Sequence, residues 1–313
     1  MPIAVIAFDF DPLLRLAEGL VVRWQTVALA AAIATALVLA GLIARRDRLR
    51  PDDLLFIAIG TVPGAVIGGR LGYVLLHLPF YQANPGAILD PGLGAMELAL
   101  GVAGGLLSGS YVASLLGVPA GRWRQAVVLP LLFVLGVGKL TMLLGGAGQG
   151  TTSGAGWATA FLGPGPWGSL APALPSTPSQ AIEALATLAV LAVLTVALWA
   201  GAFARRDGRV LFVGIAAWAV ARAVVASTWR DEAVVGGLNM GSVLAIGVGV
   251  GAVVTFIVMT IRVHRSSAGP AEAVDRGDGT TGPGSTLVGG TQAPADAPSN
   301  PTSWPDPSSR PRF

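Results

Sequence analysis

The chain has 313 residues, of which 53% are hydrophobic and only 12% are charged, and its formal net charge is +3. A soluble domain contains about 25% charged residues, so this composition excludes an ordinary soluble enzyme. The chain has no cysteine and only two histidines, His77 and His264, which excludes disulfides, thiolate catalysis and clusters of cysteine or histidine metal ligands. We therefore expect no metal site and no cofactor.

Apolar segments recur along the whole chain, and a bilayer core needs about 20 such residues in a helix. Between them lie two long segments, 79–94 and 147–178, which are rich in Gly and Pro and show no helical periodicity. The composition thus predicts an all-α, polytopic integral membrane protein with about seven transmembrane helices. The predicted spans are 20–44, 52–78, 95–116, 124–146, 179–202, 208–229 and 237–262.

Arginines gather on one side of these spans, after the first, third, fifth and seventh. Such clusters predict orientation in a membrane rather than nucleic-acid binding, although the pI is about 9.9. The bias places the N-terminus outside and the C-terminus in the cytoplasm. The predicted parts are an N-terminal extracytoplasmic segment (1–19), a transmembrane domain (20–262) and a disordered Pro-, Gly- and Ser-rich cytoplasmic tail (263–313).

Glycines recur four residues apart within three of the spans, a spacing that allows close packing of helices in lipid. We assign these glycines a packing role and no chemistry. They are Gly60, Gly64 and Gly68, then Gly101, Gly105 and Gly109, and finally Gly247 and Gly251.

Charged residues also lie within or near the spans: Arg70, Lys139, Arg222, Glu97 and Glu183. A charge near the bilayer centre costs about 2.5–3.5 kcal/mol, so each needs a reason. One interpretation is that they snorkel to an interface or form ion pairs across the bundle. The other is that several buried cations with few buried anions bind an anionic ligand, which in a membrane indicates a phosphate group.

Several motifs occur in an order that points to one family. They are PDDLL…VP…IGGRLGYVL in 51–85, TPSQAIEAL at 177–185, GRVLFVGIAAWAVARAVVASTWRDE at 208–232, GLNMGSVLAI at 237–246 and RWQT at 23–26. Over about residues 12–262 the chain closely resembles the prolipoprotein diacylglyceryl transferase family, whose members have the same seven-span topology.

This resemblance implies a reaction. Such enzymes move the diacylglyceryl group of phosphatidylglycerol onto the lipobox cysteine of a preprolipoprotein and release glycerol phosphate. The expected partners are therefore phosphatidylglycerol or another anionic lipid and lipobox-containing preprolipoproteins, with no nucleic acid. The expected location is the inner (cytoplasmic) membrane of a bacterial cell, which the chain crosses several times.

The resemblance also implies which residues form the site, by matching positions of this chain to the family motifs. Arg222 matches the arginine of the sixth helix and would bind the headgroup phosphate together with Lys139, and we expect these two to be the catalytic residues. The residues expected to bind substrate are Arg70, Tyr73, Gly138, Gly150, Gln180 and Glu183.

Some family positions hold other residues here. The signature G-R-x-G-N-F-x-N-x-E-x-x-G aligns with GKLTMLLGGAGQG at 138–150, which places Lys139 at its arginine and Ala147 at its glutamate. Ala99 stands where the third helix has a histidine, the usual group for proton transfer near neutral pH. Trp218 and Ala226 replace a tyrosine and a glutamate one turn on either side of Arg222.

Three functions remain open from the sequence. The first is an active transferase with a divergent site, which we favour. The second is a catalytically degenerate relative that binds a lipid or a partner in the membrane. The third is a small transporter, although the sequence lacks the inverted repeats and paired broken helices of many transporters.

Overall fold

The computed structural model describes residues 5–90 and 96–267, and within them it contains seven helices long and apolar enough to cross a membrane. This confirms the all-α, polytopic fold class. Lipid-facing helices satisfy their own backbone hydrogen bonds, which is why an apolar chain of this length folds as a helical bundle. The seven helices are α1 (Trp24–Arg46), α2 (Pro51–Leu76), α4 (Leu98–Leu115), α5 (Ala120–Thr141), α6 (Ser179–Trp199), α7 (Arg209–Ala226) and α8 (Met240–Ser267).

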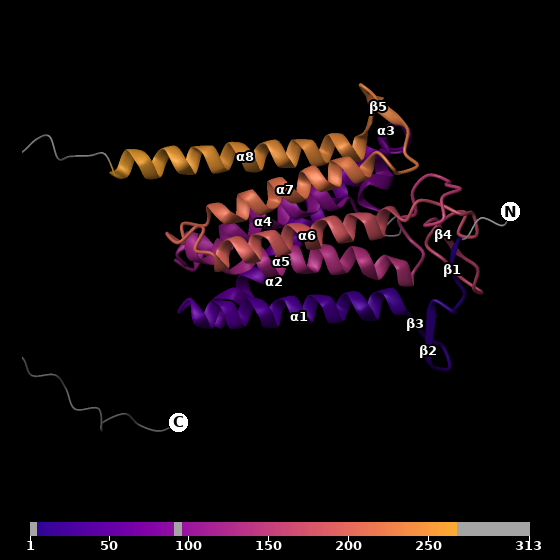
Figure 1. Ribbon diagram of the computed structural model, residues 1–313, viewed down its shortest axis with the longest axis horizontal. Coiled ribbons are helices and arrows are strands. Elements are labelled where there is room, and N and C mark those ends of the chain that lie inside the picture. Colours follow the sequence, from indigo (N-terminus) through magenta and orange to yellow (C-terminus); the bar gives the residue numbers. More distant parts are fainter. Residues whose placement is uncertain (1–4, 91–95, 268–313) are drawn as a thin grey trace, which may run out of the picture. The chain divides into compact units, whose positions relative to one another are not determined.

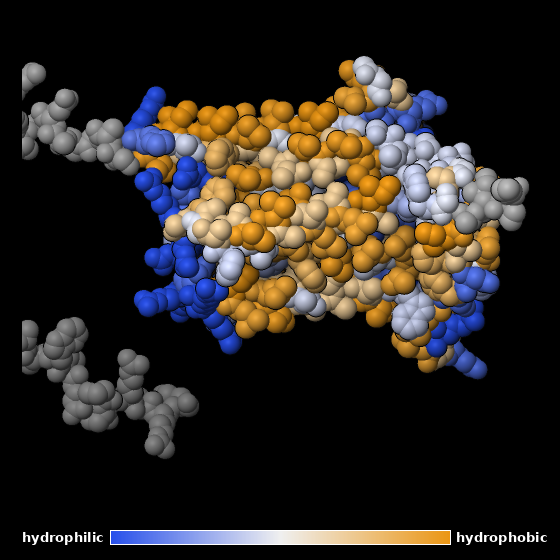
Figure 2. All heavy atoms as spheres, in the orientation of Figure 1, coloured by the Kyte–Doolittle hydropathy of each residue, from blue (hydrophilic) through white to orange (hydrophobic). Residues whose placement is uncertain are grey.

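The long helices run side by side along one direction, with most of the strands and long loops gathered at one end of the bundle (Figure 1). Figure 2 shows a broad hydrophobic belt around the middle and a strongly hydrophilic rim at the end where α1 finishes. Large apolar side chains are exposed on this belt, including Val38, Ile67 and Val193 at 62%, 62% and 68%. A surface of this kind requires lipid rather than water around it.

The closest helix pair is α2 with α4. A Cβ on Gly64 would collide with the backbone carbonyl of Gly104, and one on Gly68 would collide with the carbonyl of Leu100. The predicted packing role is therefore confirmed for the glycines of these two helices. It is wrong for Gly247 and Gly251, because no described atom lies within 4 Å of where their Cβ atoms would be.

A second region of packing surrounds α5, which contacts α1, α6 and α7. Its buried side chains include Val128 and Leu132 of α5, Leu211 and Trp218 of α7 and Leu194 of α6. On α7 the buried positions recur every three or four residues, so one stripe of this helix faces the bundle. Arg222 lies on that buried stripe.

Short strands form three two-stranded pairs in the segments that precede or connect the spanning helices. The strand β1 (Ile6–Phe8) runs parallel to β4 (Thr159–Phe161), with Phe8 opposite Phe161 and their rings stacked 5.0 Å apart. The other pairs are antiparallel: β2 (Leu13–Ala17) with β3 (Leu20–Arg23), and β5 (Ala233–Val235) with β6 (Leu238–Asn239).

Several helix boundaries in the structure differ from those predicted from the sequence. Residues 20–23 belong to β3, so the first span begins at Trp24 rather than residue 20. The segment 79–94 was expected to lack helix, but it contains α3 (Leu78–Ala83) and the 3-10 helix η1 (Pro85–Leu89), and a further 3-10 helix, η3 (Met142–Leu144), extends α5. The last helix continues to Ser267, and the rest of the predicted tail lies outside the described residues.

Candidate active site

A cavity of about 320 Å³ lies between the ends of five helices, at the end of the bundle that carries the strands. It is formed by the last turns of α2, α5 and α7, the first turns of α4 and α6, and the segments next to them. Its polar and aromatic lining residues are Tyr73, Glu97, Lys139, Gln149, Gln180, Glu183, Arg222, Trp229, Arg230 and Asp231.

Arg222 is the centre of this cavity, and its side chain is only 3% exposed. Its Nη2 donates to Glu97 Oε1 at 2.8 Å, and its Nη1 donates to Glu183 Oε1 at 2.5 Å. A guanidinium forms two such bonds readily because its donors are fixed in one plane. Arg222 therefore ties α7 to the beginnings of both α4 and α6.

Glu97 has two tasks at once. As the N-cap of α4 it accepts hydrogen bonds from the backbone N–H groups of Ala99, at 2.8 Å, and Leu100, at 2.7 Å. Those bonds satisfy donors that a helix start leaves free and place a negative charge near the positive end of the helix dipole. The same carboxylate also accepts the hydrogen bond from Arg222. The cavity thus contains a carboxylate that also begins a helix.

Lys139 completes the charged group from the end of α5. Its Nζ lies 2.9 Å from Glu183 Oε2, and its side chain is 14% exposed, against 1% for Glu183. We call Lys139, Glu183, Arg222 and Glu97 the ion cluster. Its two cations and two carboxylates balance, as buried charges must.

The balance of the ion cluster corrects the expected excess of buried cations. The count from the sequence included Arg70, but this side chain bonds instead to backbone carbonyls of the segment around η1. Its Nε donates to Ile88 O and its Nη2 to Ala87 O, both at 2.8 Å. Arg70 does not line the cavity; it joins the segment around η1 to α2.

The other predicted residues divide into two groups. Tyr73, Gln180 and Glu183 line the cavity with Lys139 and Arg222, whereas Gly138 and Gly150 do not. Gly138 lies against Leu29 of α1. The carbonyl of Gly150 accepts a 2.7 Å hydrogen bond from Arg230 Nε, so this glycine supports a lining residue rather than forming the wall.

Some buried polar groups in the cavity have no hydrogen-bond partner among the described residues. They are both amide atoms of Gln180, which is 1% exposed, the Oε1 of Gln149 and the Nε of Arg222. An unpaired buried polar group costs about 1–3 kcal/mol, so these atoms are available to a polar ligand.

Trp229 and Arg230 were not among the predicted site residues. The ring of Trp229 lies 4.8 Å from Arg222 Cζ and 5.7 Å from Lys139 Nζ, so it covers both cations. The signal in the sequence was the pair Trp229 and Arg230 at the end of the sixth span, because an aromatic ring and a cation are both typical of the membrane interface.

Comparison with known proteins decides the family. The family model for prolipoprotein diacylglyceryl transferase matches residues 12–258. The chain belongs to this family. The resemblance drawn from the motifs is confirmed.

Curated relatives in the prolipoprotein diacylglyceryl transferase family are distant. The phosphatidylglycerol–prolipoprotein diacylglyceryl transferase of Symbiobacterium thermophilum is 32% identical over 129 residues, which cover 40% of this chain and 48% of that protein. The protein of the same name from Gluconobacter oxydans is 31% identical over 169 residues, 50% of this chain and 60% of that protein. The chain thus spans about half the length of the curated relatives it matches.

The family alignment can now be placed on the structure. Lys139, aligned from the sequence motifs with the arginine of the family signature, belongs to the ion cluster. Ala99, aligned in the same way with the family histidine, is fully buried and donates its backbone N–H to Glu97. Glu97, two residues earlier, is the titratable group that this segment presents to the cavity. Trp218 lies with its ring 5.9 Å from Arg222 Cζ.

Proposed function

We propose that this protein transfers the diacylglyceryl group from phosphatidylglycerol to the lipobox cysteine of preprolipoproteins, as the names of its relatives describe for them. One observation carries the proposal. The cations at the two family positions, Lys139 and Arg222, lie on one cavity wall with a shared carboxylate, Glu183, although they come from different helices.

The headgroup phosphate would bind the donors that the ion cluster leaves free. Arg222 uses both Nη atoms within the cluster, but its Nε has no partner among the described residues. Lys139 has a single carboxylate partner and a flexible stem, so its ammonium can turn from Glu183 toward a phosphate oxygen. The amide of Gln180 can donate to one headgroup oxygen and accept from a glycerol hydroxyl.

The same movement supplies the proton acceptor that the family histidine would otherwise provide. When Lys139 turns to the phosphate, Glu183 Oε2 loses its cation and can take the proton of the substrate thiol. The thiolate sulfur then forms a bond to the glyceryl carbon while the carbon–oxygen bond to phosphate breaks. The electron pair leaves with glycerol phosphate, whose charge Lys139 and Arg222 stabilise. A donor held against the developing charge in this way is worth about 10²–10³-fold in rate.

Charge distribution supports the orientation and location of the reaction. Arg45 and Arg46 end α1 and Arg50 precedes α2, at the end of the bundle opposite the cavity, and Figure 2 shows a hydrophilic rim at that end. By the positive-inside rule this rim faces the cytoplasm. The cavity then opens at the outer half of the cytoplasmic membrane, where it would meet phosphatidylglycerol and an exported preprolipoprotein.

The test uses purified protein in detergent, labelled phosphatidylglycerol and a lipobox peptide, with the thioether product as the readout. We expect product from the natural protein, none from Arg222→Ala, and unchanged product from the control Arg265→Ala on the exposed end of α8. Because Arg222→Ala leaves Glu97 without its cation and Glu183 with Lys139 alone, it can also destabilise the fold, so Lys139→Ala serves as a second loss variant. Folded protein that binds the lipid but forms no product would overturn transfer and support a degenerate, lipid-binding relative.

A further inference from the structure

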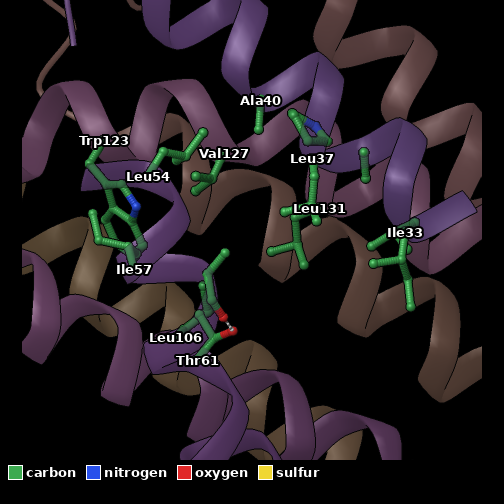
Figure 3. Close-up of a pocket in the computed structure, with 14 residues that line it drawn as sticks. Ile33, Leu37, Ala40, Leu54, Ile57, Thr61, Leu106, Trp123, Val127 and Leu131 are labelled. Atoms are coloured by element: carbon green, nitrogen blue, oxygen red, sulfur yellow. Dashed lines mark hydrogen bonds between the residues drawn. The ribbon is translucent and has the colours of Figure 1, made fainter. Parts of the chain in front are cut away.

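A second cavity lies toward the opposite end of the bundle from the ion cluster. It has a volume of about 210 Å³ and lies between α1, α2 and α5, with one contribution from α4. Its lining is almost entirely apolar, and it shares no residue with the charged cavity. Figure 3 shows side chains that line it, including Ile33, Leu37, Leu54, Trp123 and Leu131. We call it the apolar groove.

The apolar groove has the length of one lipid leaflet. Trp123 and Leu54 are the fourth residues of α5 and α2, so each lies about 5 Å from the start of its helix at 1.5 Å per residue. Ile33 lies 13 residues before the end of α1, or about 20 Å from that end. The hydrocarbon core is about 30 Å thick in total, so the groove extends across the half next to the arginine-rich rim.

One polar atom marks the shallow end of the groove. Trp123 is 2% exposed, and its Nε1–H has no acceptor among the residues that the structure describes. The indole nitrogen lies on the side of the ring that faces the other lining residues (Figure 3). At this depth a phospholipid presents its ester carbonyls, which can accept that hydrogen bond, while its acyl chain covers Leu54, Ile57 and Leu131.

The rim above the groove has an excess of cations. Four exposed arginines lie where α1 ends and α2 begins: Arg45, Arg46, Arg48 and Arg50. Of the carboxylates there, Asp47 is bound by Arg206 at 2.5 Å, which leaves Asp52 and Asp53 in the first turn of α2. Exposed cations beside a bilayer attract anionic lipids by about 1 kcal/mol each.

We propose that the apolar groove binds one anionic diacyl phospholipid of the cytoplasmic leaflet. An acyl chain fills the groove, an ester carbonyl accepts from Trp123 Nε1, and the headgroup lies on the arginines of the rim. This lipid is distinct from any lipid that reacts at the ion cluster, because the two cavities share no lining residue and lie toward opposite membrane surfaces. The site does not depend on whether the protein is an active transferase.

The test measures quenching of tryptophan fluorescence in vesicles of phosphatidylcholine with 20% of the lipid brominated on its acyl chains. The contribution of Trp123 is the difference between the natural protein and Trp123→Phe. We expect brominated phosphatidylglycerol to quench this contribution at least twofold more than brominated phosphatidylcholine. Equal quenching by the two lipids would overturn the anionic site.

Matched variants separate the groove from the general lipid annulus. Ala36→Phe places a ring in the groove and should abolish the difference between the lipids. Ala34→Phe adds the same ring two residues away, on an exposed position of α1 that does not line the groove. This variant should keep the difference in quenching between the two lipids. Arg45→Gln combined with Arg50→Gln, both on exposed residues, should remove the headgroup preference but retain quenching. A preference that persists in Ala36→Phe would overturn the groove as the binding site.

Discussion

Arg222 of α7 and Glu97 at the start of α4 form a buried ion pair, Nη2 to Oε1 at 2.8 Å, between residues 125 positions apart in the chain. Since Glu97 also caps α4, the substitution Glu97→Gln should weaken both the cap and the pair. An amide oxygen can still accept one of these bonds, so we expect a loss of about 1–3 kcal/mol in stability rather than complete unfolding. Thermal unfolding in detergent measures this loss.

The control for that variant is Glu232→Gln, which changes the same functional group on an exposed residue after α7. It should leave the melting temperature unchanged. If the two variants melt alike, Glu97 does not hold α4 to α7.

Lys139 offers a test of whether its charge or its shape matters. Lys139→Ala removes a donor for the leaving phosphate and should lower kcat by about 10²-fold or more. Lys139→Arg restores the residue of the family signature, keeps a cation beside Glu183 and Trp229, and should retain activity within about tenfold, since a guanidinium binds phosphate at least as well. Initial rates with labelled phosphatidylglycerol measure both. Unchanged turnover in Lys139→Ala would contradict the role given to this residue.

Gln180 should affect substrate binding without affecting stability. Its amide makes no hydrogen bond to the described residues, so Gln180→Leu removes no protein contact of that kind. We expect KM for the lipid to rise about tenfold, as for a lost hydrogen bond to a ligand, with a melting temperature within a few degrees of the natural protein. Gln125→Leu is the matched control, because Gln125 Oε1 is also unpartnered but lies outside the charged cavity. A rise in KM in both variants would rule out a specific contact.

Gly104 tests the contact between α2 and α4. A methyl group there would collide with the backbone of Gly64, so Gly104→Ala should destabilise the protein by about 1–3 kcal/mol. Gly247→Ala is the control, because no described atom lies within 4 Å of the added carbon, and alanine favours a helix over glycine. Thermal unfolding of the two variants should therefore shift in opposite directions, or only the first should shift. Equal shifts would mean that the close approach of α2 and α4 does not limit packing.

The seven spans could be predicted because the length of an apolar run is itself the signal, and the fold confirms them. The packing role of the glycines in α2 and α4 could be predicted too, since they are spaced one helical turn apart, although the spacing does not pair these two helices. The same spacing misled at Gly247 and Gly251, where small residues face no neighbour within 4 Å. Spacing identifies a smooth helix surface but does not say which helix, if any, covers it.

The site was predictable only in part. Because burying a charge in the membrane is costly, Lys139, Glu183 and Arg222 could be predicted to need partners. That cost does not indicate which helices face one another. The pairing of Arg222 with Glu97 depends on the packing of α4 against α2 and α8 and of α7 against α8, and no local pattern encodes it. Arg70 carries the same sequence signal as Arg222, but three backbone carbonyls near η1 bind it.

The parallel pairing of β1 with β4 has a consequence for how the protein is made. Ile6 lies opposite Thr159, and four spanning helices separate them: α1, α2, α4 and α5. An even number of crossings returns the chain to the side on which it began, as the pairing requires. During synthesis β1 is made before β4, so it stays unpaired until all four helices have been inserted. Closure of this end of the bundle is therefore a late step in biogenesis, after more than half of the membrane crossings are in place.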